Sequence, residues 1–290
     1  MFTGSITALV TPFTNGELDV KALKKLVRYQ IDNGSHGLVP VGTTGESPTL
    51  SEEEHKRVIE VTVSEVAGQI PVIAGAGSNN PIEAIKYSHH AQQAGADATL
   101  HVAGYYNRPN QEGLYQHFRQ VHDETALPII LYNIPPRTIV GLDVDTVARL
   151  AELPRIVGIK DATGDVTRVL SERARISKEF SYLSGDDIAS VAYAVGGGMG
   201  CISVTANVAP KLISQLNTLC LEGKFTEARA LQDTLVPLHK SLFMEPNPAG
   251  AKYAASLLGL CEANCRLPVV ALQDSTKAAI KSAMAGLGLI

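Results

Sequence analysis

The sequence predicts an α/β fold, a (β/α)8 TIM barrel, with a helical appendix at its C-terminal end. Three observations support this prediction. Short apolar runs alternate with longer amphipathic segments, which is the pattern of right-handed βαβ units. A chain of 290 residues has a length that one such barrel commonly occupies. Glycines and polar residues repeatedly follow the apolar runs, and in a barrel these strand ends share the face on which active sites lie.

The predicted strands are short apolar runs bounded by turn residues, as expected for the buried strands of a parallel sheet. They cover residues 5–10, 37–41, 70–74, 96–102, 128–132, 156–160, 180–184 and 201–204. An open doubly wound sheet is the alternative arrangement of such units. The sequence disfavours it, because no Gly-x-Gly-x-x-Gly motif opens a helix after the first strand.

Helix signals lie between these strands. Asp19 is expected to cap a helix with a continuous apolar stripe. That stripe consists of Leu23, Leu26, Val27 and Ile31. Ser51 and Glu54 have the spacing of a capping box, and Pro81 has the position of a first helical residue. After the eighth strand, helices are expected over residues 225–243, 248–258 and 274–287. The predicted division is therefore a catalytic barrel at 1–224 and a three-helix extension at 225–290.

The composition indicates which classes of function are not expected. Hydrophobic residues make up 45% of the chain and charged residues 19%, as in ordinary globular proteins. The formal net charge of −4, without a basic cluster, predicts no nucleic-acid or membrane partner. No positively charged leader is present, so a cytoplasmic location is expected. The cysteines have no metal-binding spacing and are expected to be reduced structural thiols, and neither a metal nor a cofactor is predicted. They are Cys201, Cys220, Cys261 and Cys265.

Lys160 is the candidate catalytic residue. It follows the apolar run Ile156-Val-Gly-Ile159, and lysine is rarely buried without a partner. One interpretation is a strand-end lysine whose amine reaches solvent. The other is a lysine whose amine is held uncharged, since such an amine is a nucleophile that forms a Schiff base with a carbonyl carbon.

Other polar motifs follow neighbouring strands. The turn at 42–46 (Gly-Thr-Thr-Gly-Glu) predicts either helix-capping residues or a nest of N–H groups and hydroxyls for a small carboxylate. Tyr132 and Arg137 offer an acid/base hydroxyl and a forked cation, or alternatively a packed tyrosine and a surface arginine. Tyr105 and Tyr106 have the character of a subunit contact. Because all of these motifs lie at strand ends around one lysine, the catalytic interpretation of Lys160 is favoured.

Taken together, these motifs are recognisable. The segments 42–46, 132–138 (Tyr-Asn-Ile-Pro-Pro-Arg-Thr) and 158–163 (Gly-Ile-Lys-Asp-Ala-Thr) closely resemble the dihydrodipicolinate synthase family. This family belongs to the pyruvate-dependent class I aldolases, which include N-acetylneuraminate lyase. The resemblance covers essentially the whole chain. It implies condensation of pyruvate with L-aspartate 4-semialdehyde, the first committed step towards diaminopimelate and lysine.

The resemblance also implies a role for individual residues. Lys160 would form the Schiff base with pyruvate. The family's hydroxyl relay matches Thr43, Tyr132 and Tyr106, and the last of these comes from the adjacent subunit. This implies at least a dimer, and usually a homotetramer made of two tight dimers.

Substrate contacts follow from the same resemblance. Thr44 and Ile202 match positions whose backbone contacts pyruvate, and Arg137 matches the arginine that receives the semialdehyde carboxylate. Ala103-Gly104 departs from the usual Thr-Pro, which loosens the backbone before the tyrosine pair.

A site for L-lysine as an effector is implied as well. Its residues match His55, Asn79, Glu83 and Tyr105. Glu52 departs from this pattern, since a histidine is common there in members that lysine inhibits.

Two alternative functions remain open at this stage. One is a related aldolase that uses the same enamine on another aldehyde, such as an N-acetylneuraminate or keto-deoxy-sugar acid lyase. Arg137 distinguishes this aldolase from the synthase, because the arginine would bind the carboxylate of the semialdehyde. The other is a non-catalytic barrel that binds keto acids. The hydroxyl relay disfavours it, because binding alone requires no proton transfer.

Overall fold

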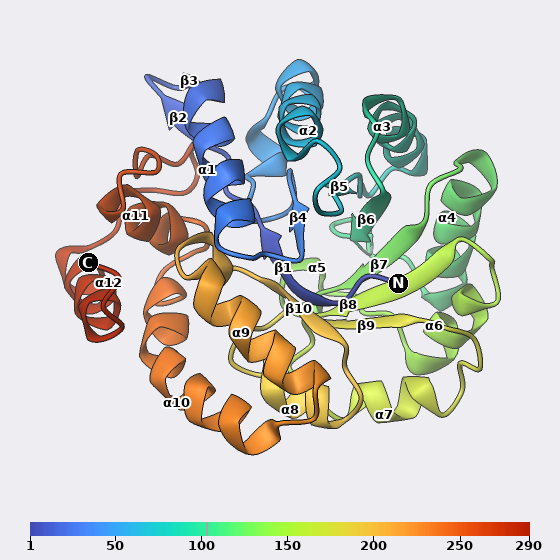
Figure 1. Cartoon of the computed structure of the whole chain (residues 1–290). Helices are drawn as coiled ribbons and strands as arrows, with labels where there is room; N and C mark the ends of the chain where they lie inside the picture. The colour runs from blue at the N-terminus through green and yellow to red at the C-terminus, as the bar shows by residue number, and fades with distance from the viewer. Residues whose placement is uncertain (103) are drawn as a thin grey trace.

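A ring of parallel strands forms the centre of the computed structural model, which describes residues 1–102 and 104–290 (Figure 1). Within these residues, eight strands are hydrogen-bonded in the order β4-β1-β10-β9-β8-β7-β6-β5. A parallel bridge between Leu38 and Val72 closes the ring. The strands are β1 (Gly4–Ala8), β4 (Gly37–Val39), β5 (Ile73–Gly75), β6 (Ala98–Val102), β7 (Ile129–Asn133), β8 (Ile156–Asp161), β9 (Ser181–Ser184) and β10 (Gly200–Ser203). The predicted barrel and its strands are confirmed, with boundaries that differ by a few residues.

Helices surround this ring and follow the strands in sequence (Figure 1). The predicted helix starts are confirmed: Asp19 accepts a bond from the Ala22 N–H, and Ser51 and Glu54 form the reciprocal capping box. Each pairing satisfies N–H groups that have no partner within the helix. The helices are α1 (Val20–Asp32), α2 (Glu52–Val66), α3 (Pro81–Ala94), α4 (Gln111–Glu124), α6 (Val144–Ala151), α7 (Arg168–Arg173), α8 (Ser190–Val195) and α9 (Pro210–Leu221).

Some short elements were not predicted from the sequence. A hairpin of β2 (Phe13–Thr14) and β3 (Glu17–Leu18) projects at the outer edge and turns at Asn15-Gly16. Strands of two residues are too short to show hydrophobic periodicity, although Asn-Gly is a common hairpin turn. The helix α5 (Pro135–Thr138) and the 3-10 turns η1 (Ser47–Thr49) and η2 (Thr205–Asn207) are of similar length.

The C-terminal helices α10 (Phe225–Leu242), α11 (Ala249–Leu257) and α12 (Asp274–Gly286) lie on one side of the barrel, as predicted (Figure 1). α10 contacts α8, α9 and α12. Their buried side chains belong to the same hydrophobic cluster as barrel residues, for example Leu238 and Ala254 with Ile6 and Tyr132. The three helices therefore share a core with the barrel, and the division at residue 224 stays a prediction.

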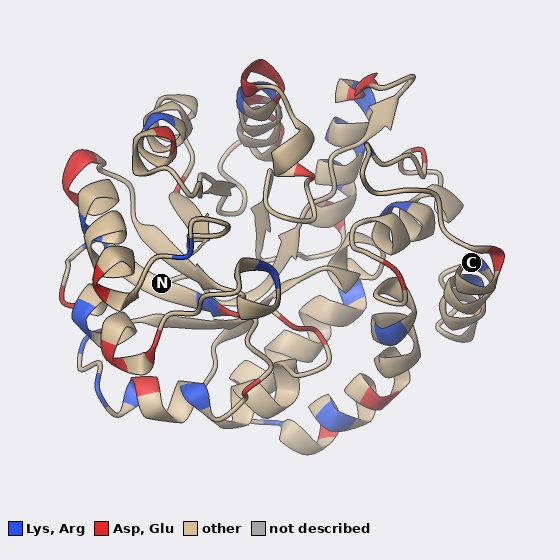
Figure 2. Cartoon of the chain, turned by 180° about the vertical axis from the view of Figure 1, so that it is seen from behind, with Lys and Arg blue, Asp and Glu red and all other residues tan. Residues whose placement is uncertain are grey.

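The surface charges of both signs are interspersed along the outer helices (Figure 2). In the described part of the chain, no helix is long and apolar enough to cross a bilayer.

Candidate active site

Lys160 lies on β8 at the carboxyl end of the barrel, where its register partners are Tyr132 on β7 and Leu183 on β9. Its side chain is buried, with 6% of the residue exposed. The ammonium nitrogen lies 4.1 Å from the centroid of the Tyr132 ring, a cation–π distance. No carboxylate of the described residues forms an ion pair with it. The ring of Tyr132 is therefore the main support of the amine.

Gly185 makes room for Lys160 on the opposite side. A Cβ atom at this position would lie 2.7 Å from the Cβ of Ala162 and 3.1 Å from the Cε of Lys160. The first distance is a clash, so the position needs a residue without a side chain. The lysine chain thus passes between Tyr132 and Gly185.

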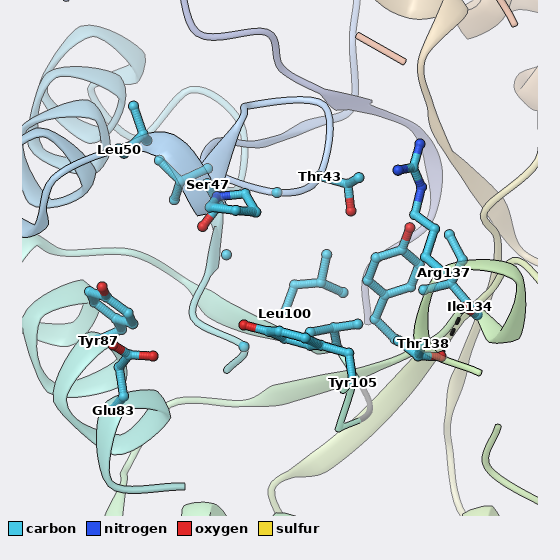
Figure 3. Close-up of a pocket in the computed structure, with 17 residues that line it drawn as sticks. Thr43, Ser47, Leu50, Glu83, Tyr87, Leu100, Tyr105, Ile134, Arg137 and Thr138 are labelled. Atoms are coloured by element: carbon cyan, nitrogen blue, oxygen red, sulfur yellow. Dashed lines mark hydrogen bonds between the residues drawn. The ribbon is translucent and has the colours of Figure 1, made fainter. Parts of the chain in front are cut away.

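A cavity of about 490 Å³ has Tyr132 in its wall, and Lys160 lies behind this ring and is not itself among the lining residues. Thr43 and Arg137 lie on one side of it, and Glu83 and Tyr87 lie on the other (Figure 3). Tyr105 lies between the two sides, at the lower centre of the view (Figure 3). The cavity therefore contains members of both the predicted catalytic set and the predicted effector set.

The turn that carries Thr43 and Thr44 approaches β5 closely. A Cβ atom at Gly75 would lie 2.3 Å from the carbonyl oxygen of Val41, so this contact requires glycine. Val41 and Glu46, which flank the threonines, have positive φ angles of 50° and 56°. Non-glycine residues adopt this conformation only where their surroundings impose it.

The two threonines of this turn are oriented differently. Thr43 is partly exposed and lines the cavity, whereas Thr44 is 3% exposed and its hydroxyl accepts a hydrogen bond of 3.0 Å from Asn247. The hydroxyl of Thr44 therefore does not face the cavity, and the expected contact of its backbone with pyruvate stays a prediction. Among the described residues, neither threonine N–H donates to a backbone carbonyl. Adjacent N–H groups of this kind suit an anion such as a carboxylate.

Arg137 is on α5, a short helix that begins with two prolines after β7. Its guanidinium is exposed on the cavity wall and forms no ion pair with the described residues. The hydroxyl of the next residue, Thr138, holds the turn: its one hydrogen is shared between the carbonyl oxygens of Ile134 and Val140, which lie 2.9 and 2.6 Å away. The backbone that carries Arg137 is thus fixed, and its guanidinium has no hydrogen-bond partner among the described residues.

The remaining predicted site residues lie at several places. Ile202 is fully buried on β10. His55 stacks on Tyr87 with 4.1 Å between ring centroids, and the Asn79 amide donates to the carbonyl of Tyr105. Tyr106 is 94% exposed and is not part of the cavity wall in the single chain. Ala103 lies outside the described residues.

An ionic cluster that the sequence did not predict is buried behind Lys160. Arg168 contacts Asp161 at 3.1 Å and Glu172 at 3.0 Å. Glu172 is fully buried, and its second oxygen has no partner in the described residues. Burial raises the pKa of Glu172 to about 7, the Asp161 carboxylate adds to this effect, and Arg168 opposes it. The i,i+4 spacing of Arg168 and Glu172 was a signal for the pair, but it did not indicate that the pair points inward.

Asp187 has a structural role in the segment after β10. Its carboxylate accepts bonds from the Val204 and Thr205 N–H groups at 2.9 and 3.1 Å and from the Ser203 hydroxyl. The carboxylate thus satisfies the free N–H groups at the start of the short η2 turn. Among the described residues, no group of three or more His, Cys, Asp or Glu has the geometry to hold a metal ion.

The protein comparisons agree with this geometry. The model of the Dihydrodipicolinate synthetase family matches residues 1–286. The 4-hydroxy-tetrahydrodipicolinate synthase of Ruegeria pomeroyi is 56% identical over 290 residues, which is the full length of both chains. The dihydrodipicolinate synthase of Acinetobacter baumannii complexed with pyruvate is 43% identical, with a TM-score of 0.98 over the full length of both chains. The enzyme of Cyanidioschyzon merolae with lysine bound is 37% identical, with a TM-score of 0.97, and covers 100% of this chain and 99% of its own.

Proposed function

Because the chain belongs to the dihydrodipicolinate synthetase family, we propose that it condenses pyruvate with L-aspartate 4-semialdehyde to give 4-hydroxy-tetrahydrodipicolinate. The observation that supports this most directly is the buried Lys160, held over the ring of Tyr132, which together with Arg137 lines the cavity. The named relatives reported above are all synthases, which favours this reaction over a sugar-acid lyase and over a non-catalytic keto-acid-binding barrel.

The first half of the reaction activates pyruvate. The carboxylate of pyruvate would accept hydrogen bonds from the free N–H groups of Thr43 and Thr44. The Lys160 amine then adds to the keto carbon, and loss of water gives the iminium. The iminium withdraws electrons from the methyl carbon, so that loss of one methyl proton gives a nucleophilic enamine. The Thr43 and Tyr132 hydroxyls on the cavity wall are the proposed proton carriers.

The second half joins the two substrates. The enamine carbon attacks the aldehyde carbon, and the resulting alkoxide takes up a proton. The amine of the semialdehyde then attacks the iminium carbon, the ring closes, and Lys160 leaves as a free amine. The forked guanidinium of Arg137 would hold the semialdehyde carboxylate, which its exposed position on the cavity wall permits.

Tyr106 would complete the hydroxyl relay from a second copy of the chain. At 94% exposure its ring packs little against its own barrel, and its φ of 66° is a conformation that non-glycine residues rarely adopt. This proposal requires a dimer, and we extend it to a homotetramer made of two dimers. A cytoplasmic location likewise stays a prediction.

Reduction with borohydride in the presence of pyruvate tests the proposed nucleophile. We expect a stable adduct on the peptide that contains Lys160, located by mass spectrometry, and no adduct in Lys160→Ala. Lys240→Ala is the matched control, because Lys240 lines a second cavity at the same end of the barrel. An adduct on a different side chain, or none in the wild-type chain, would refute the mechanism.

We also propose that L-lysine binds as an effector between Tyr105 and the side of the cavity formed by Glu83 and Tyr87. Support comes from the Cyanidioschyzon merolae relative with lysine bound and from the stack of His55 on Tyr87 beside Glu83. Glu52, at the departing position, is already paired with Lys56 and Lys86 at 2.6 Å each. Isothermal titration should detect binding that Glu83→Gln weakens. No heat with millimolar L-lysine, together with unchanged activity, would dispose of this proposal.

A further inference from the structure

The 42–46 loop is held by side chains that lie more than 200 residues later in the sequence. The carboxylate of Glu46 is 3% exposed, and one of its oxygens contacts the Lys252 ammonium on α11 at 2.7 Å. The other oxygen accepts a 2.8 Å bond from the backbone N–H of Arg266. Lys252 is itself fully buried. Both oxygens of one loop carboxylate are therefore bound by the C-terminal extension.

Arg266 ties the same region to two further elements. Its guanidinium contacts both oxygens of Glu54 at 2.5 and 2.6 Å and donates to the carbonyl groups of Thr49 and Gly16. Glu54 is the capping-box residue of α2, the helix that follows the loop. The Phe13 ring lies 4.2 Å from the Arg266 guanidinium carbon and 4.3 Å from the Lys252 nitrogen. The β2–β3 hairpin thus provides an aromatic surface for both cations.

A third contact reaches the threonine turn directly. The side-chain amide of Asn247 donates to the Thr44 hydroxyl at 3.0 Å, and both residues are buried. This bond turns the hydroxyl of Thr44 away from the cavity while Thr43 faces it. The C-terminal extension therefore fixes the loop at Thr44 and at Glu46, one residue on each side of Gly45.

The backbone of this loop needs such support. Val41 and Glu46 both have the left-handed conformation, which a free chain rarely adopts outside glycine. A buried ion pair is weak evidence for stability, because desolvation offsets the attraction between its charges. The two directed bonds to the Glu46 carboxylate instead give this residue a defined position.

We propose that Asn247, Lys252 and Arg266, here called the C-terminal clamp, are positioning residues for Thr43 and Thr44. The clamp sets the direction of the two threonine N–H groups and of the Thr43 hydroxyl relative to Lys160. The catalytic part of this inference rests on the function proposed above, whereas the mechanical part, that the clamp orders the loop, is independent of it.

The double variant K252M/E46Q tests the clamp. It removes both buried charges together, so neither is left without a partner, and the amide oxygen that replaces the carboxylate can still accept from the Arg266 N–H. Lys252→Met alone would leave the Glu46 carboxylate buried without its ammonium partner. This single variant serves only to measure how much the unpaired charge lowers the stability of the fold. We expect the double variant to fold, with roughly a 10- to 100-fold fall in kcat/KM, mainly through a higher KM for pyruvate. The same variant should form the borohydride-trapped adduct more slowly.

Amide hydrogen exchange provides the readout that does not depend on activity. In K252M/E46Q we expect faster exchange in the peptide that covers residues 41–50 and unchanged exchange in β7. The matched control is R28M/E65Q, which removes a 2.5 Å ion pair that joins α1 to α2 on the outside of the barrel. That control should change neither the exchange of the loop nor the KM for pyruvate.

The outcomes separate the two proposals. If the wild-type chain forms no adduct on Lys160, the proposed function fails, and the exchange measurement still decides whether the clamp orders the loop. If K252M/E46Q lowers only the melting temperature and leaves loop exchange and the KM for pyruvate unchanged, the clamp is a stabilising contact and the inference is overturned. Asn247→Ala should raise the KM for pyruvate in the same direction, because it frees the Thr44 hydroxyl.

Discussion

The buried carboxylate of Glu172 should make the stability of this protein depend on pH in a defined direction. The pKa of Glu172 is raised from 4.5 to about 7, mainly by burial, with Arg168 as its only ion-pair partner in the described residues. Between these values the folded chain holds a proton that the unfolded chain has lost. The contribution of Glu172 is therefore most favourable below pH 4.5 and is lost as the pH rises through about 7.

The size of the effect follows from the difference in pKa. It corresponds to about 3 kcal/mol of unfolding free energy above pH 7. Glu172→Gln keeps an oxygen that can accept from Arg168 and has no charge to lose at any of these pH values. At pH 8 the variant should be more stable than the wild type by an amount of that order, or about 5 °C in melting temperature for a chain of this length. At pH 5 the two should differ little.

Thermal unfolding followed by circular dichroism between pH 5 and pH 8 measures this difference. Glu179→Gln is the control, because Glu179 is an exposed glutamate close to Glu172 in the sequence. The melting temperature of Glu179→Gln should depend on pH in the same way as that of the wild type. If Glu172→Gln were equally stable or less stable than the wild type at pH 8, Arg168 would be holding an ionised carboxylate, and the argument from burial would be wrong.

Three further predictions concern the site. Tyr132→Phe keeps the ring beneath Lys160 and removes the hydroxyl, so steady-state assays should show a kcat that is lower by roughly 100- to 10,000-fold. Borohydride should still trap pyruvate in this variant, and loss of trapping would mean that the Tyr132 hydroxyl positions the Lys160 amine. Arg137→Ala should raise the KM for the semialdehyde by about tenfold or more and spare the pyruvate adduct, and normal semialdehyde kinetics would remove the main support for the acceptor. Gly185→Ala should slow adduct formation by roughly tenfold, since its Cβ would meet Ala162 at 2.7 Å, and an unchanged rate would show that the segment moves freely.

The barrel was predictable from the sequence because its signals are local. Apolar runs, capping residues and strand-end glycines repeat along the chain, and each can be interpreted within a short window. Lys160 was not selected by its place after an apolar strand alone, because a strand-end lysine that reaches solvent has the same pattern. The polar motifs at neighbouring strand ends and the family resemblance made it the candidate nucleophile. The Asn15-Gly16 hairpin had a recognisable turn, but its strands of two residues gave no pattern to confirm it.

The contacts that hold the site in place were not predictable, because they join residues far apart in the sequence. Nothing near Lys252 indicates that its ammonium pairs with Glu46, and nothing near Asn247 indicates that its amide reaches Thr44. For Thr44, a hydroxyl available to a ligand was one of two interpretations of the residue type, and the direction of the hydroxyl depends on a partner 203 positions away. Residue types can therefore be inferred locally, but orientations are set by long-range packing.

The contact between Glu46 and Lys252 has a consequence for the order of folding during synthesis. The two residues are separated by 206 positions, so a ribosome delivers the loop long before its partners emerge. Strands and helices of the ring can associate as they appear, since their contacts are mostly between neighbours in sequence. The bonds that orient the threonines form only when the last helices join the barrel, and a nascent chain thus acquires the proposed nucleophile, Lys160, well before that lysine becomes useful.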